Sequence, residues 1–174
     1  MTSPAFVDQL RTILMRDLRA LRREIEAYPD DASVWAVPEG ISNPGGTLVL
    51  HLVGNLRSFV GRVLGNDGYE RDRPREFGAR DLSRTELLRD IDVTLAAIDH
   101  AMPMVTADAL SAEYPMAVGT VKVNTQDFLV HLAVHLGYHL GQVDYHRRIV
   151  TRSPSTVATV SPAELSSATP VPAA

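Results

Sequence analysis

Four segments of the chain repeat large apolar residues at intervals of three and four positions, the spacing that gathers them on one face of an α-helix. These segments cover about residues 3–25, 43–64, 83–102 and 124–151. The rest of the chain shows no convincing strand pattern. Helices with one apolar face each bury those faces against one another, so the sequence predicts an all-α, antiparallel four-helix bundle.

Local signals locate two of the helix starts. Ser83 and Glu86 form a Ser-x-x-Glu capping box, in which each side chain satisfies a free backbone N–H of the first turn. Pro103 ends the same helix, because proline cannot donate to a helical hydrogen bond. For the first helix we expect Ser3 as the N-cap and Pro4 at the first helical position, where a missing N–H costs little.

Long connections separate these helices. Residues 28–46 and 65–81 are rich in proline, glycine and charge and are predicted loops, long enough for one crossover between non-adjacent helices. Residues 107–123 are ambiguous between a loop and a short pair of strands. From residue 153 the chain consists of small and polar residues that cannot bury enough surface to offset chain ordering. We therefore expect a bundle domain over residues 1–152 and a flexible tail over residues 153–174.

Composition excludes several classes of protein. The net charge is -4 and the basic residues are scattered, which argues against a nucleic-acid-binding face. Charged residues interrupt the first twenty positions, so these form neither a signal peptide nor a membrane span, and we expect a cytoplasmic protein. The chain has no cysteine, so any metal must be held by imidazole, carboxylate or carbonyl groups.

The histidines are placed unevenly. His135 and His139 stand four residues apart in the fourth segment, a spacing that lets two imidazoles of one helix reach the same metal ion. His51 lies midway along the second segment, also beside its apolar face. Burying three imidazoles in a bundle interior is costly unless their nitrogens have partners. A divalent cation would be a common partner for all three rings. The sequence therefore predicts a metal site at His51, His135 and His139.

Other histidines leave alternatives open. A single histidine on an inner face is usually a core residue with satisfied hydrogen bonds. His131 also stands four residues from His135, so spacing alone permits a His131–His135 pair. His100 ends the third segment, where a cation suits the helix dipole. His146 precedes two arginines near a helix end, and we expect it in solvent or behind the ligands.

Some polar residues are candidates for supporting roles. Asn55 and Gln142 are predicted to orient the ligands from behind, or else to satisfy the polar interior of the bundle. A fourth protein ligand, which would close the site, has no obvious candidate, although Glu113 and the carboxylates of residues 69–76 stay open. The charged run over residues 71–77 reads as a solvated loop, with a place beside the metal pocket as the alternative.

Two motifs resemble a known family. His135-Leu-Gly-Tyr-His139-Leu-Gly-Gln142 is similar to the His-x-x-x-His-x-x-Gln signature of the DinB-like (YfiT-like) family of metal-dependent proteins. The stretch from His51 to Arg57 and the run over residues 71–77 resemble one subgroup of that family. The likeness covers about residues 5–150, and the glutamine fixes the register that selects His135 and His139 over His131.

The resemblance implies more than the spacing does. Family members are four-helix bundles, often homodimers, in which histidines corresponding to His51, His135 and His139 bind zinc, nickel or iron. Some relatives are transferases or isomerases that use a low-molecular-weight thiol such as mycothiol, bacillithiol or glutathione. We therefore expect a metal-dependent enzyme, a thiol-dependent transferase or a hydrolase, with an open three-histidine site for a small molecule. The alternative is a non-catalytic dimeric scaffold or sensor that the metal stabilises; catalytic residues stay unknown.

Overall fold

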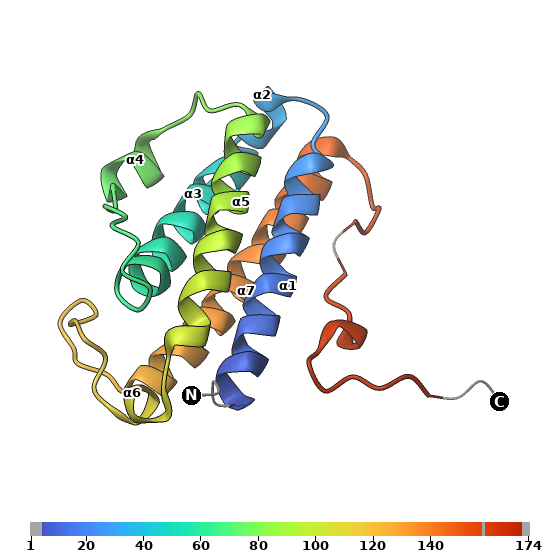
Figure 1. Ribbon diagram of the computed structural model, residues 1–174. Coiled ribbons are helices and arrows are strands. Elements are labelled where there is room, and N and C mark those ends of the chain that lie inside the picture. The colour runs from blue at the N-terminus through green and yellow to red at the C-terminus, as the bar shows by residue number, and fades with distance from the viewer. Residues whose placement is uncertain (1–4, 158, 172–174) are drawn as a thin grey trace.

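Four long helices form the body of the protein in the computed structural model, which describes residues 5–157 and 159–171 (Figure 1). They are α1 (Ala5–Glu26), α3 (Gly45–Leu56), α5 (Arg84–Ala101) and α7 (Thr125–Thr151). Within the described ranges no strand is present, only two isolated β-bridges in the connection that precedes α7. The all-α bundle that the sequence predicted is confirmed.

Short elements occupy the connections. They are α2 (Asp31–Val34), the π-helix η1 (Arg57–Arg62), α4 (Arg73–Gly78), the 3₁₀ turn η2 (Met102–Met104), α6 (Ala107–Ser111) and the 3₁₀ turn η3 (Pro162–Glu164). The predicted loop over residues 65–81 thus contains one helix, α4, whose N-cap Asp72 accepts a hydrogen bond from the backbone N–H of Arg75. These pieces matter because α4 lies directly against α3.

Each long helix packs against two others: α1 contacts α5 and α7, and α3 contacts the same two helices. The helices α1 and α3 therefore lie diagonally opposite each other, as do α5 and α7. Followed along the chain, α1 runs up, α3 and α5 run down and α7 runs up (Figure 1). Neighbours α1–α5 and α3–α7 are therefore antiparallel, whereas α1–α7 and α3–α5 are parallel. Both the link from α1 to α3 and the link from α5 to α7 cross the bundle diagonally, one crossover more than the sequence suggested.

Within the residues that the structure describes, the helix boundaries agree with the local signals in the sequence. Ser83 and Glu86 exchange the hydrogen bonds of a capping box, as predicted. The predicted cap at Ser3 and Pro4 lies outside the described residues. The second predicted helix continues past α3 as η1, where the N–H of Val63 bonds the carbonyl of Ser58 at 3.3 Å, five residues back.

The α3 helix is the most enclosed of the four, since all twelve of its residues are buried. Two glycines bring η1 and the turn that follows it close to α5: a Cβ at Gly61 of η1 would lie 3.3 Å from the Cβ of Ala97, and one at Gly65 of the turn would lie 2.6 Å from that of Ala101. Such close contacts place α3 deep in the bundle. Any polar side chain on it must therefore find a partner inside the protein.

The chain after α7 lies beside α1 and α7 (Figure 1). Arg147 donates to the carbonyl of Ser155 at 2.7 Å, and Arg19 pairs with Glu164 at 3.7 Å. The flexibility expected of this tail stays a prediction. Among the described helices, none combines the length and the apolar character that a membrane crossing requires.

Candidate metal centre

Three histidines from two helices converge midway along the α3–α7 contact. His51 of α3 and His135 and His139 of α7 each offer a ring nitrogen, and these three atoms lie within 4.8 Å of one another. The shortest approach joins Nε2 of His51 and Nε2 of His135, at 3.3 Å. The ring centroids are 4.5–5.3 Å apart. We call this group the three-histidine cluster.

The helices explain why the rings meet. His135 and His139 are one turn apart on the edge of α7 that faces α3, and α3 runs antiparallel to α7 so that His51 comes opposite them. Burial, followed by the repulsion from His139, lowers the pKa of His135 to about 4, and burial also lowers the pKa of His139. At neutral pH these two imidazoles are uncharged, which is the form that ligates a metal ion.

Hydrogen bonds on the far side of two rings decide which nitrogen is free. His51 Nδ1 lies 3.2 Å from a carboxylate oxygen of Glu76, and His139 Nδ1 lies 2.6 Å from Oε1 of Gln142. Both oxygens only accept, so each Nδ1 carries the proton and donates it. The two Nε2 atoms then keep their lone pairs, and Nε2 of His51 faces the ring of His135. In metal proteins this arrangement behind the ring orients histidine ligands.

The cluster fits a divalent ion. In a tetrahedral site with metal–nitrogen bonds of about 2.0–2.1 Å, the nitrogens are roughly 3.3 Å apart, which matches the distance between His51 and His135. Without a metal, Nε2–H of His135 can donate to Nε2 of His51 at this distance, and a cation held between the two nitrogens would take the place of that proton. The buried Nδ1 of His135 has no hydrogen-bond partner. Three nitrogen donors and no thiolate suit zinc, nickel or iron.

Glu76 is the residue that sequence reasoning placed least well. The carboxylates of residues 69–76 were open as a fourth ligand, but Glu76 lies behind the ring of His51, at Nδ1. Burial is the largest single influence and raises the pKa of Glu76, but the hydrogen bonds and positive charge from Arg71 and His51 act together and lower that pKa overall. The ring centroid of Phe77 lies 5.3 Å from that of His51, so the end of the charged run lies beside the site, while residues 72–75 are exposed to solvent, as expected. The signal in the sequence was a glycine, Gly54, one turn after His51.

The remaining carboxylate and amide candidates lie in different places. Glu113 pairs with Lys122 at 2.8 Å on the surface and belongs to no group of potential ligands among the described residues. Gln142 contacts His139, and its role in orienting a metal ligand stays a prediction. Asn55 is buried one turn after His51, and its Oδ1 has no hydrogen-bond partner.

The other histidines do not join the cluster. His131 is exposed and stacks on His135 with 5.9 Å between the ring centroids. His100 is exposed, as expected. The expectation that His146 lies in solvent or behind the ligands was wrong: its ring is buried and bonds Tyr28 and the carbonyl of Ala36 instead. The bulk of the α1 end and of the loop before α3 covers it, which helical spacing alone does not reveal.

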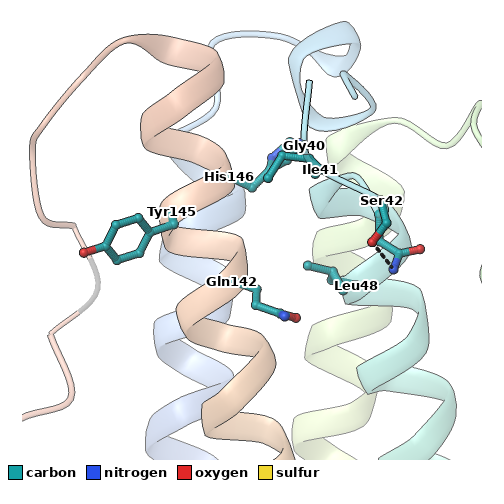
Figure 2. A pocket seen from close by; sticks show the side chains of 8 residues that line it. Gly40, Ile41, Ser42, Leu48, Gln142, Tyr145 and His146 are labelled. Atoms are coloured by element: carbon teal, nitrogen blue, oxygen red, sulfur yellow. Dashed lines mark hydrogen bonds between the residues drawn. The ribbon is translucent and has the colours of Figure 1, made fainter. Parts of the chain in front are cut away.

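A pocket of about 230 Å³ adjoins the cluster where α3 begins and α7 approaches its end (Figure 2). Gln142 belongs to its lining, and Figure 2 shows this side chain directed toward the space between α7 and α3, whereas Tyr145 points away. Leu48 and the loop over residues 40–43 supply the opposite wall. No aspartate, glutamate, lysine or arginine lines this pocket, and burial lowers the pKa of His146, which also belongs to the lining. Gln142 connects the pocket to His139.

A four-helix bundle with a half-buried three-histidine cluster defines the class of this protein as an all-α protein with a potential divalent-metal site. The sequence profile of the DinB superfamily matches residues 13–143, and the chain belongs to that superfamily. No curated protein and no solved structure matches the chain.

Proposed function

We propose that this protein is a divalent-metal-dependent enzyme of the thiol-dependent transferase type, in which His51, His135 and His139 hold the ion. The observation that carries the proposal is the convergence of three ring nitrogens with no fourth protein ligand among the described residues. Three protein ligands leave a coordination position for water or substrate, the pattern of catalytic rather than structural zinc sites. Membership of the DinB superfamily supports the metal site.

The bound ion would act as a Lewis acid that lowers the pKa of a water or a thiol near neutral pH. The protein's own residues prepare the site. Burial keeps His135 and His139 uncharged, and the acceptors on Glu76 and Gln142 hold the free nitrogens toward the centre. No side chain of the chain supplies a thiol, because there is no cysteine. As the resemblance to thiol-dependent relatives implies, a low-molecular-weight thiol would enter as a cosubstrate.

The pocket beside Gln142 is the proposed place for the small molecule. Its size suits a small substrate or one end of a thiol cosubstrate. Because Ser42, Asn43 and Gln142 provide hydroxyl and amide groups and no formal charge lines the wall, an uncharged polar group fits it best.

The direct test combines elemental analysis with an activity screen. We expect about one divalent ion per chain in purified wild-type protein and none in His51→Ala. Thiol transfer to a panel of electrophiles, with mycothiol, bacillithiol and glutathione as donors, should stop when a chelator removes the ion and return when it is restored. Activity that is indifferent to the chelator contradicts the enzyme proposal. Bound metal without activity on any substrate favours the scaffold or sensor.

A homodimer is part of the proposal, because α7 exposes a row of large apolar side chains. Their exposed fractions range from 40% to 67%. The row consists of Val130, Val134, Tyr138, Tyr145 and Ile149. Apolar surface of this kind on a soluble helix indicates a partner. Analytical ultracentrifugation should show a dimer for the wild type and a monomer for Val130→Glu/Val134→Glu with metal content unchanged; a monomeric wild type refutes the dimer.

A further inference from the structure

The helix α4 buries a single side chain, that of Glu76. This carboxylate is 4% exposed, and both of its oxygens are engaged. Arg71 donates from Nε to Oε1 at 2.6 Å and from Nη2 to Oε2 at 2.9 Å. His51 Nδ1 reaches Oε2 at 3.2 Å. The resulting chain Arg71–Glu76–His51 joins a guanidinium, a carboxylate and a ring of the three-histidine cluster.

The backbone of α3 is shaped to admit this carboxylate. Gly54 lies one turn after His51, and a Cβ built on it would lie 2.7 Å from Cδ of Glu76 and closer still to Oε1. Any residue larger than glycine would therefore push the carboxylate off α3. The glycine is helical, so its purpose here is close approach rather than a turn.

We infer that Glu76 is a positioning residue of the metal centre, held by Arg71 and admitted by Gly54, which fixes the Nδ1–H form of His51 so that Nε2 faces the metal. This inference rests on the proposed function. Among the three rings, only that of His51 has a charged acceptor behind it: His139 has the neutral amide of Gln142, and Nδ1 of His135 has no partner. The carboxylate strengthens the ligand that α3 contributes, because an ionised acceptor makes the imidazole a better donor to the metal.

The form of α4 agrees with this role. A helix of six residues is too short to be stable by itself. It is stabilised by its cap at Asp72 and by packing on α3, and the group that it delivers to the interior is Glu76. A purely structural element of this size would bury an apolar side chain instead, since a buried carboxylate is costly unless it is fully paired.

The affinity for Zn²⁺ alone, measured by competition with a chromophoric chelator, tests the inference. Glu76→Gln keeps the shape of the side chain but leaves one acceptor for the donors of both Arg71 and His51. Gly54→Ala keeps Glu76 but displaces it. We expect each variant to bind Zn²⁺ about 10–100-fold more weakly than the wild type. Gly137→Ala is the matched control, because a Cβ there meets no atom within 4 Å, and its affinity should stay at the wild-type value.

A second measurement separates positioning from folding. Nitrogen-15 NMR of the histidine rings in metal-free protein should show the Nδ1–H form of His51 in the wild type and in Gly137→Ala, and a mixture of the two forms in Glu76→Gln. Unchanged circular dichroism and thermal midpoint of the metal-free variants would exclude a folding defect as the cause.

The outcomes are distinguishable. Wild-type protein that binds no Zn²⁺, nickel or iron overturns the proposed function. Wild-type protein that binds Zn²⁺, beside a Glu76→Gln variant with the same affinity and the same His51 form, overturns the role of Glu76. Weaker binding together with a changed ring form supports it.

Discussion

Two polar clusters lie inside this bundle, and they differ in whether both ring nitrogens of their histidines have a hydrogen-bond partner outside the cluster of rings. The three-histidine cluster lies between α3 and α7. The second, which we call the α1–α7 polar cluster, consists of Glu24, Tyr28, His146 and Arg147. Arg147 bonds Glu24 at 2.5 Å, and Tyr28 lies 2.7 Å from Nδ1 of His146.

Burial alone does not distinguish a ligand from a structural histidine. His146 is 2% exposed and His51 is 9% exposed, yet the more deeply buried ring is the one that has no free nitrogen. Nδ1 of His146 meets the hydroxyl of Tyr28, and Nε2 meets the carbonyl of Ala36 at 2.9 Å. In the three-histidine cluster the Nε2 atoms of His51 and His135 face each other instead. A structural histidine has hydrogen-bond partners at both ring nitrogens, whereas a candidate ligand has one ring nitrogen directed at the other histidines.

The largest expected effect is the loss of metal from the three-histidine cluster. His135→Ala removes one of three nitrogen donors, so we expect its metal content to fall from about one ion per chain to nearly none. His146→Phe, the matched change in the α1–α7 polar cluster, should keep the wild-type content. Elemental analysis of both proteins checks this. Loss of metal from His146→Phe would contradict the purely structural role of His146.

Next in size is the cost of opening the α1–α7 polar cluster. Arg147→Ala leaves Glu24 as an unpaired carboxylate at 0% exposure, and breaking a buried pair costs about 3–5 kcal/mol of the free energy of unfolding. Urea unfolding measures this loss. Arg22→Ala removes a surface pair with Asp92 and should cost less than about 1 kcal/mol. Equal losses in the two variants would mean that the buried ion pair contributes no more to the free energy of unfolding than the surface pair does.

Acid should destabilise the metal-free protein through the three-histidine cluster. Burial and the neighbouring His139 lower the pKa of His135 from 6.5 to about 4, so between these values the unfolded chain takes up a proton that the folded chain does not. Stability is therefore lost as the pH falls from about 6.5 to about 4 and is insensitive to this group above 6.5. Urea midpoints at pH 7 and pH 5 should differ less in His135→Gln than in the wild type. An equal difference would assign the acid response to other groups.

The smallest expected effect comes from the outer side of α7. Gly137 stands between two residues of the three-histidine cluster, yet a Cβ there meets open space. Gly137→Ala should therefore raise the free energy of unfolding by about 0.5–1 kcal/mol through helix propensity, without a change in metal content. Thermal unfolding and elemental analysis check this. A loss of metal would show that α7 must flex between its two ligands.

Much of the bundle could be predicted from local signals. Apolar periodicity located the four long helices, and the capping box at Ser83 set the start of α5, because both depend on residues within one or two turns. The separation of His135 and His139 by one turn likewise placed two rings on one face. These predictions succeeded where the interacting residues are close in the sequence.

Contacts between distant segments could not be predicted in the same way. Glu76 reaches His51 across twenty-five positions, through a helix whose six residues have no usable periodicity. The partners of His146, Tyr28 and Ala36, lie more than a hundred positions away. Their assignment depends on which helix ends meet, and hence on the direction in which each helix crosses the bundle.

By itself, the sequence determined the four helices and the local pairing of His135 with His139, since helix geometry follows from spacing along one segment. Only the tertiary structure decided that α3 lies beside α7 in the opposite direction, which brings His51 to that pair. It also decided that Glu76 stands behind His51 while Tyr28 closes His146. The physical reason is that the role of a ring nitrogen, as metal ligand or hydrogen-bonding group, depends on which atoms lie opposite it. Those atoms are set by packing between helices that the chain connects only through long loops.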